Sequence, residues 1–273
     1  MNKYAPIGFF DSGFGGLTVL KEVRSLLPDY DYLYLGDNDR APYGNKSSKE
    51  VYEYTWECVQ NLFKKGCDLV ILACNTASAK ALRKIQQNDL KNFPGKRVLG
   101  VIRPSAEIVG DYSITKKLII LGTQGTIDSS TYLEEFAHIS PEIDVWQQAC
   151  PEWVPLIEAQ KYSTEEGKQQ IVKDVERALK SLPSGDVILL GCTHYPIIQD
   201  IIEEQVPTNV KVISQGSIVA ISLMSYLERH GWMKTKLSKG STIEYLTTGE
   251  KDQFETHASM ILEEKIKAKN IIL

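Results

Sequence analysis

The stretch Leu69–Ala79, LVILACNTASA, governs the interpretation of the whole chain. It is an apolar run that ends at Cys74, with Asn75, Thr76 and a predicted helix directly behind it. A short apolar run closed by polar residues is typical of a buried parallel strand that leads into a helix. Ligands of open parallel sheets bind beyond the carboxyl ends of such strands, so this pattern places the Cys74 thiol at a candidate site.

The same pattern returns at Val187–Ile197, VILLGCTHYPI, where an apolar run ends at Cys192 and is followed by Thr193 and His194. A thiol beside the first N–H groups of a helix lies in a position that favours anions. Two cysteines placed in this way predict a pair of thiols that face one shared site.

Short apolar runs alternate with amphipathic segments along the rest of the chain. Ser47 and Glu50 form a predicted capping box for one long helix, and Gly66 is its predicted stop. Predicted strands cover residues 6–10, 30–35, 69–73, 97–101, 117–121, 143–146, 187–190, 211–213 and 242–247. Predicted helices cover 17–27, 47–66, 78–87, 128–137, 164–182, a segment after 213 and a last one from 252. This alternation predicts an α/β fold with doubly wound parallel sheets.

The two cysteine stretches divide the chain into similar halves. The spacing from Asp11 to Cys74 is close to that from Thr123 to Cys192, and each half has a loop of small residues after its first strand. We interpret this as an internal duplication of one α/β unit. The prediction is two doubly wound domains related by pseudo-symmetry, with the active site between them. Residues 1–101 plus 212–273 form the first predicted domain, and residues 102–211 form the second.

The composition is that of an ordinary globular protein. The chain has 273 residues, of which 42% are hydrophobic and 24% charged, and its formal net charge is −4. It shows no basic footprint for nucleic acid, no apolar run long enough for a membrane span and no secretory signal. Five cysteines without regular spacing predict free thiols in a reducing compartment. We therefore expect a cytoplasmic protein with no nucleic-acid or membrane partner.

The other candidate groups have ordinary explanations as well as functional ones. The loop DSGFGG at Asp11–Gly16 lacks the G-x-G-x-x-G spacing and the P-loop lysine, and Asp11 is either a helix cap or a catalytic group. Cys192-x-His194 is half of a zinc site, but no second ligand pair accompanies it, so we expect no metal. The remaining cysteines are interpreted as core: Cys58, Cys67 and Cys150. The remaining histidines are interpreted as structural or solvent-facing: His138, His230 and His257.

Two facing thiols have two chemical uses. They could form a redox disulfide, although they lie in separate halves of the chain rather than in a C-x-x-C motif. They could instead act as acid and base on opposite faces of one carbon, because the ordinary pKa of a thiol, about 8.5, lies near neutrality. Removing a proton from one face and returning one to the other inverts a stereocentre.

Six motifs resemble those of the glutamate racemase family, in the family's order and across nearly the whole chain. They are DSGFGG (Asp11–Gly16), GDxxxAPYG (Gly36–Gly44), ACNTAS (Ala73–Ser78), GTQGT (Gly122–Thr126), CPEWVPLIE (Cys150–Glu158) and GCTHYP (Gly191–Pro196). One departure is Asn38-Asp39, where the family usually has Thr-Ala.

The resemblance implies a cofactor-independent enzyme, a homodimer, that interconverts L- and D-glutamate and supplies the D form for peptidoglycan. By position, Cys74 would deprotonate D-glutamate and Cys192 would deprotonate L-glutamate. Asp11 and His194 would assist the thiols, and Glu158 would pair with His194. The implied substrate contacts are Asp11, Ser12, Pro42, Tyr43, Gly44, Asn75, Thr76, Thr123, Thr126, Thr193 and His194. The alternatives are a related aspartate racemase, a non-catalytic amino-acid-binding or regulatory protein, and a thiol redox sensor.

Overall fold

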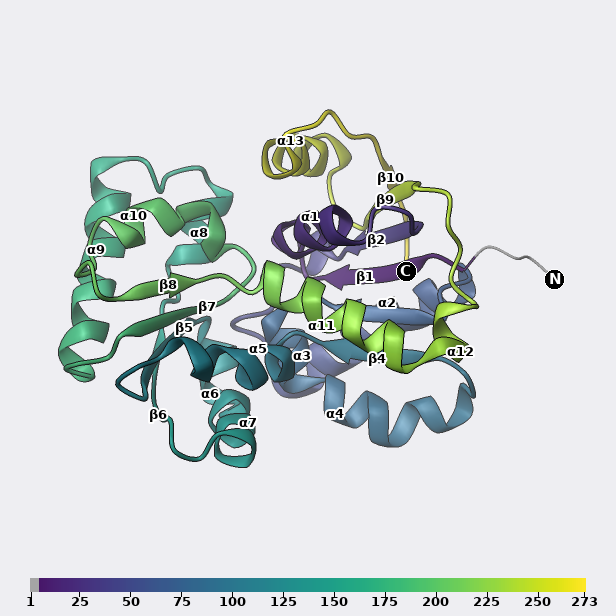
Figure 1. Cartoon of the computed structure of the whole chain (residues 1–273). Coiled ribbons are helices and arrows are strands. Elements are labelled where there is room, and N and C mark those ends of the chain that lie inside the picture. The colour runs from purple at the N-terminus through teal and green to yellow at the C-terminus, as the bar shows by residue number, and fades with distance from the viewer. Residues whose placement is uncertain (1–4) are drawn as a thin grey trace.

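A computed structural model describes residues 5–273, and these residues contain two parallel β-sheets (Figure 1). The first sheet has the strand order β10-β9-β2-β1-β3-β4 and the second has the order β6-β5-β7-β8. The strands of the first sheet are β1 (Ile7–Asp11), β2 (Tyr32–Gly36), β3 (Leu69–Leu72), β4 (Arg97–Gly100), β9 (Ile243–Thr247) and β10 (Ala268–Asn270). Those of the second are β5 (Lys117–Gly122), β6 (Asp144–Ala149), β7 (Val187–Gly191) and β8 (Lys211–Ile213). The predicted α/β fold with parallel sheets is confirmed.

Both sheets have the same strand order around their first strand. β1 lies between β2 and β3, and β5 lies between β6 and β7, with β4 and β8 beyond the third strand of each set. The strand order therefore reverses at β1 and at β5, and ligands of such sheets bind at this reversal, beyond the carboxyl ends of the strands. The repeated order supports the interpretation of an internal duplication. We propose that each sheet is the core of one domain.

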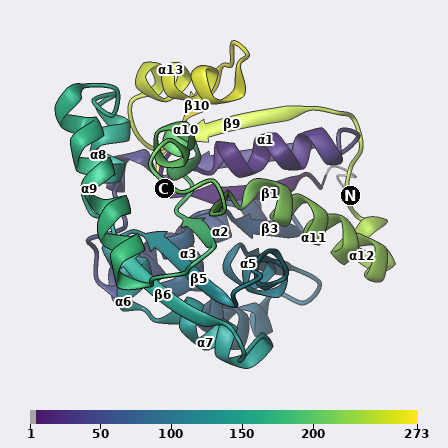
Figure 2. The same ribbon diagram turned by 60° about the vertical axis from the view of Figure 1, so that its left-hand side comes forward.

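Helices cover both faces of each sheet (Figures 1 and 2). On the first sheet, one face carries α1 (Leu17–Leu26), α11 (Gly216–Arg229) and α13 (Lys251–Leu262), and the other carries α2 (Ser48–Lys64). On the second sheet, one face carries α5 (Ile102–Val109) and α7 (Thr131–Ile139), and the other carries α8 (Trp153–Glu158), α9 (Glu165–Ser181) and α10 (Gln199–Glu203). The remaining helices are α3 (Asn75–Lys80), α4 (Leu82–Lys84), α6 (Gln124–Asp128) and α12 (Gly231–Lys234). None of the described helices is long and apolar enough to cross a membrane.

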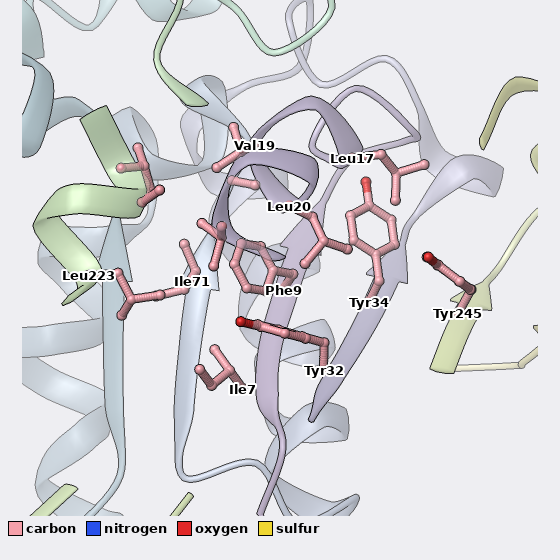
Figure 3. Packing of buried hydrophobic residues seen from close by; sticks show 14 of the residues in the cluster. Ile7, Phe9, Leu17, Val19, Leu20, Tyr32, Tyr34, Ile71, Leu223 and Tyr245 are labelled. Carbon is pink, nitrogen blue, oxygen red and sulfur yellow. The ribbon is translucent and has the colours of Figure 1, made fainter. Parts of the chain in front are cut away.

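The core follows from the alternation of side chains along each strand. In β1, Ile7 and Phe9 point to the face under α1, where Phe9 lies near Leu20 (Figure 3). Phe10 points to the opposite face, where it belongs to the same buried cluster as Val59 of α2. Because both faces of β1 are buried, its sequence is a continuous apolar run and not an alternating one.

Local signals placed some helix ends correctly and others wrongly. The capping box of Ser47 and Glu50 is present, and Gly66 follows the helix with φ +101°. The helix predicted from residue 78 begins at Asn75, because Cys74 is its N-cap and accepts a hydrogen bond from the backbone N–H of Ala77. The helix predicted over 128–137 is instead two helices, α6 and α7.

The elements not predicted from the sequence include α5, α8, α10, α12 and β10. Two of these helices contain a proline in their first turn, Pro104 in α5 and Pro155 in α8. Proline is tolerated there because the first N–H groups of a helix have no intrahelical partner. β10 is a three-residue edge strand of largely polar sequence, Ala268–Asn270, so it carries no apolar alternation to detect.

Candidate active site

One pocket is lined by residues from the carboxyl ends of both sheets, including both strand-end cysteines. Cys74 follows β3 and Cys192 follows β7, which are the equivalent strands of the two sheets. The other predicted residues that line it are Ser12, Pro42, Tyr43, Gly44, Asn75, Thr76, Thr123, Glu158, Thr193 and His194. The structure therefore brings most of the predicted site to one place, with both thiols unbonded.

Cys74 is held in its protonated form by its surroundings. It is buried at the start of α3, where its Sγ lies 3.4 Å from the backbone nitrogen of Ala77 and 3.5 Å from Ser12 Oγ. Burial raises the pKa of the Cys74 thiol to about 12, and the nearby charge of Asp11 acts in the same direction. In the substrate-free protein at neutral pH, this thiol is equipped to donate a proton.

Cys192 is the first member of a chain of three groups. Its Sγ lies 3.9 Å from Nδ1 of His194, and Nε2 of His194 lies 3.1 Å from Oε1 of Glu158. Burial lowers the pKa of His194, but the interactions with Cys192 and Glu158 outweigh it and raise the pKa to about 10. With a pKa of about 10, His194 carries a positive charge at neutral pH next to the Cys192 sulfur.

Asp11 ends β1 and is fully buried behind the pocket. Its Oδ1 accepts a hydrogen bond from the backbone N–H of Gly13 at 2.9 Å, and its Oδ2 accepts one from Oγ1 of Thr193 at 3.2 Å. Burial raises the pKa of Asp11, whereas the positive charge of His194 and the Gly13 hydrogen bond lower it. Asp11 does not line the pocket; it reaches the site through Thr193 and through its charge next to Cys74.

Three threonine hydroxyls meet where α3 faces α6. Oγ1 of Thr76 lies 2.9 Å from Oγ1 of Thr123 and 3.2 Å from Oγ1 of Thr126. Thr126 does not line the pocket and contacts the two threonines that do. Close by, the backbone N–H of Gly125 donates to the carbonyl of Gly44 at 2.8 Å. This hydrogen bond fixes the turn that contains Gly44 against the first turn of α6.

The amide of Asn75 is used inside the protein, although the residue lines the pocket. Its Nδ2 donates to Oε1 of Gln215 at 2.6 Å, and its Oδ1 accepts from the hydroxyl of Tyr132 at 2.7 Å. Gln215 also donates to Oγ of Ser105 at 2.7 Å and to the carbonyl of Val101 at 3.2 Å. The chain passes from the first sheet to the second near Val101, and it returns to the first near Gln215. The network therefore connects both of these segments to Asn75, the residue after Cys74.

The loop between β2 and α2 is organised around Asp37, which is fully buried. Its carboxylate accepts hydrogen bonds from the hydroxyl of Tyr43, from Nε of Arg40 at 2.7 Å and from Oγ1 of Thr248 at 2.8 Å. These bonds hold Tyr43, and with it the turn Pro42–Gly44, at the rim of the pocket.

The departure at Asn38-Asp39 lies outside the pocket. Oδ1 of Asn38 accepts from Oγ1 of Thr247 at 3.0 Å, and the backbone N–H of Asp39 donates to Oγ1 of Thr248 at 3.1 Å. Both contacts tie the loop to the end of β9. The departure therefore affects how this loop is attached to the sheet and not which side chains line the pocket.

Several residues of the pocket were not singled out from the sequence. They are Asn45, Gln124, Pro151, Val154 and Pro155. Three of these five lie between Cys150 and Glu158, inside the motif CPEWVPLIE, so this motif could have indicated them as pocket residues.

The interpretation of the other cysteines as core is confirmed, since Cys58, Cys67 and Cys150 are fully buried and burial raises the pKa of each thiol. His257 fits the structural half of the expectation for the remaining histidines, because it is buried and contacts the carbonyl of Glu158. The described residues contain no group of three or more His, Cys, Asp or Glu side chains that could hold a metal ion.

Comparisons with known proteins identify relatives of this chain and of its fold. The sequence model of the Asp/Glu/Hydantoin racemase family matches residues 18–221. A glutamate racemase from Ruegeria sp. is 39% identical over 271 residues, which are 95% of this chain and 97% of the relative. Among solved structures, glutamate racemase isoform RacE1 from Bacillus anthracis has a TM-score of 0.91 and 31% identity, with 100% of this chain and 99% of that chain covered. The Francisella tularensis glutamate racemase, solved in complex with D-glutamate, has a TM-score of 0.87 and 27% identity over 99% of this chain and 98% of its own.

Proposed function

The chain belongs to the Asp/Glu/Hydantoin racemase family and, within it, to the glutamate racemases, and we propose that it interconverts L- and D-glutamate in the pocket shared by Cys74 and Cys192. It is an amino-acid racemase, an isomerase. The observation that carries the proposal is the placement of two thiols, one from each sheet, on one pocket. A binding protein needs no such pair.

The proposed reaction is a proton abstraction on one face of Cα and a proton delivery on the other. With L-glutamate bound, the Cys192 thiolate takes the Cα proton and becomes a thiol, and the electron pair left on Cα spreads into the adjacent carboxylate. Cys74 then gives its proton to the opposite face, which forms D-glutamate and leaves a Cys74 thiolate. Exchange with solvent returns both sulfurs to their starting forms. From D-glutamate the two cysteines exchange roles.

The protonation states inferred for the free protein suit the L-to-D direction. Cys74 keeps its proton because burial raises its pKa to about 12, and the raised pKa of His194, about 10, provides the positive charge beside Cys192. Glu158 would hold His194 in place through Nε2, as a carboxylate commonly does for a catalytic imidazole. Asp11 would act on Cys74 through its charge.

The substrate's carboxylates and amino group would meet hydroxyls and backbone N–H groups. The pocket offers the hydroxyls of Ser12, Thr76, Thr123 and Thr193 and the turn Pro42–Gly44. Asn75 would contribute its backbone, since its side-chain amide is bonded to Gln215 and Tyr132. Hydroxyl and N–H donors of this kind bind anions without a buried arginine.

The first test measures optical activity with four substrates. Circular dichroism of the purified protein with L-glutamate should fall to zero at equilibrium, and D-glutamate should do the same from the opposite sign. L- and D-aspartate serve as the discriminating arms. Faster turnover of aspartate than of glutamate would make the protein an aspartate racemase, and no change with any of the four would leave a binding protein.

The second test counts the bases with solvent deuterium. When L-glutamate is turned over in heavy water, two bases should give D-glutamate deuterated at Cα while the unreacted L-glutamate keeps its protium. The deuterated product returns more slowly than the unlabelled substrate goes forward, so the optical signal should overshoot zero before it settles. A single base that serves both faces would place deuterium in the recovered substrate from the start, and this result would exclude the two-thiol mechanism.

The proposed role extends to a cofactor-free homodimer in the cytoplasm that supplies D-glutamate for peptidoglycan. We expect activity to survive exhaustive EDTA treatment, sedimentation to give a dimer, and expression of the chain to rescue growth of a bacterium that requires D-glutamate. If EDTA inactivated the enzyme and added zinc restored its activity, the proposal that no cofactor is needed would be wrong. Failure of rescue by an enzyme that is active in vitro would separate the cellular role from the reaction.

A further inference from the structure

The geometry points to His257 as a positioning residue that holds the His194–Glu158 pair in place, an inference that rests on the proposed function. His257 lies in the middle of α13, which packs beside α1 in both views (Figures 1 and 2). The residue is 5% exposed and does not line the pocket. Any effect on the reaction must therefore pass through its neighbours.

The first of these neighbours is the backbone of Glu158. Nε2 of His257 lies 3.1 Å from the carbonyl oxygen of Glu158, which is the last residue of α8. The last carbonyls of a helix lack intrahelical partners, and within residues 5–273 no backbone N–H donates to this one. With its proton on Nε2, the imidazole of His257 donates to this carbonyl and satisfies the end of α8 at the residue whose carboxylate contacts His194.

The second neighbour is Phe14, which lies between the two imidazoles. The ring of His257 stacks on Phe14 with centroids 4.3 Å apart and an interplanar angle of 11°. Phe14 in turn meets the ring of His194 at 5.0 Å and 60°, an edge-to-face arrangement. His194 is therefore supported by the Glu158 carboxylate and by the Phe14 ring, and His257 contacts the residues that provide both supports.

These contacts join the two sheets' units on one side of the pocket only. α13 follows β9 of the first sheet, whereas α8 follows β6 of the second. Cys74 takes its contacts from Ser12 and from the first turn of α3. Loss of the His257 contact should therefore raise the barrier for proton transfer at Cys192 more than the barrier at Cys74.

The two ring nitrogens of His257 can be tested separately. Nδ1 lies 2.9 Å from the carbonyl of Gln253 in the same helix, and Nε2 makes the contact to Glu158. A glutamine amide can place its nitrogen near the position of Nε2, and an asparagine amide near that of Nδ1. His257→Gln should therefore keep the contact that matters, and His257→Asn should lose it.

The matched control is His230. Its Nδ1 makes the same contact to a carbonyl four residues earlier, that of Tyr226, at 2.8 Å, and its ring also stacks on an aromatic side chain. It follows α11 and does not line the pocket. His230→Asn should leave the kinetics of the enzyme unchanged.

The experiment measures racemisation by circular dichroism, with glutamate carrying protium or deuterium at Cα. Because the enantiomers are equally stable, kcat/KM must be equal in the two directions for every variant. Only the isotope effects can therefore distinguish slower proton transfer at Cys192 from slower proton transfer at Cys74. We expect His257→Asn to lower kcat/KM about tenfold through misplacement of His194, and His257→Gln to restore most of it. In His257→Asn the isotope effect should rise with labelled L-glutamate, whose deuteron goes to Cys192. It should fall toward one with labelled D-glutamate, whose deuteron goes to Cys74.

Two results would overturn the inference: isotope effects that stay as in the wild type or move together, and a glutamine variant no better than the asparagine variant. Should His257→Asn not fold, as judged by its thermal melt, His257→Met removes both ring nitrogens while keeping the side chain's bulk, and the same isotope pattern is required of it. A wild-type protein that racemises no glutamate refutes the proposed function instead, so the two failures are distinguishable.

Discussion

At the scale of single residues, the site places two identical side chains in different surroundings. Cys74 lies next to the carboxylate of Asp11, which together with burial raises the pKa of the Cys74 thiol. Cys192 lies next to His194, whose own pKa is raised by its bonds to Cys192 and Glu158 despite its burial. Environments that push two groups toward opposite forms are the usual way in which one site obtains both an acid and a base.

Replacing either pocket thiol should abolish racemisation. Cys74→Ala and Cys192→Ala each remove one of the two proton carriers, so we expect a loss of at least about a thousandfold in kcat with the fold intact. The matched controls are Cys58→Ala, Cys67→Ala and Cys150→Ala, which should keep activity and lose about 1 kcal/mol of stability. A control variant that folds but is as inactive as the pocket variants would show that Cys74 and Cys192 are not the two proton carriers.

The charge of His194 should contribute to stability over a defined pH range. Its folded pKa of about 10 lies above the ordinary value of 6.5, so protonation favours the fold. This contribution is complete below the unfolded pKa and is lost as the pH rises through the folded pKa. We expect the unfolding midpoint of the wild type to fall between these values more steeply than that of Glu158→Gln, where the pKa of His194 is less raised. Parallel curves for the two proteins would contradict this.

At the scale of elements, the site is built from strand ends, helix starts and one loop. β3 and β7 end at the two thiols, and the loop between β2 and α2 brings the turn Pro42–Gly44 to the rim. That loop has no regular structure of its own beyond a short 3₁₀ turn, so its position depends on side-chain hydrogen bonds to the buried carboxylate of Asp37.

Removing one of these bonds should weaken substrate binding. In Tyr43→Phe the ring stays, but the hydrogen bond from its hydroxyl to Asp37 is lost, and we expect a loss of about 2 kcal/mol of stability because the acceptor is charged and buried. KM for glutamate should rise several-fold with a smaller change in kcat. Tyr52→Phe is the control, since its hydroxyl bonds Asp89 away from the pocket. Equal effects of the two substitutions would count against a role of the loop in binding.

At the scale of the whole molecule, the arrangement of the two sheets makes the site nearly symmetric. Each sheet contributes its third strand's cysteine, and the hydrogen-bond network of Asn75, Gln215 and Tyr132 crosses between the sheets' units. Racemisation is itself nearly mirror-symmetric at Cα. A pair of similar units with a site between them therefore suits the proposed reaction, in which one proton carrier serves each face of the substrate.

The dependence of activity on pH should report this pairing. One thiol must be ionised while the other stays protonated, so kcat/KM against pH should be bell-shaped, with limbs that belong to the coupled pair and not to single residues. On the alkaline side, activity should fall as His194 loses its proton near pH 10 and Cys74 loses its own near 12. Profiles measured from L- and D-glutamate should coincide. A flat plateau at high pH would show that no protonated acid is required.

The sequence by itself determined the fold class and the position of each thiol along its own strand. These features follow from contacts between near neighbours in the chain: apolar runs for buried strands, the capping box at Ser47 and Glu50, and the glycine after α2. The motif resemblance added the family. Local signals conflict where a proline lies in the first turn of a helix, as Pro104 and Pro155 do, and the sequence pattern does not identify these helices.

Only the tertiary structure decided what surrounds each group. The fold places Cys74 and Cys192 on one pocket. It also directs the amide of Asn75 into an internal hydrogen-bond network, and it places His257 of α13 against the end of α8. A pKa depends on burial and on charges within a few ångströms, and those neighbours come from segments far apart in the chain. Local patterns contain no information about such distances, which is why the sequence located both thiols along their strands but not the groups that surround them.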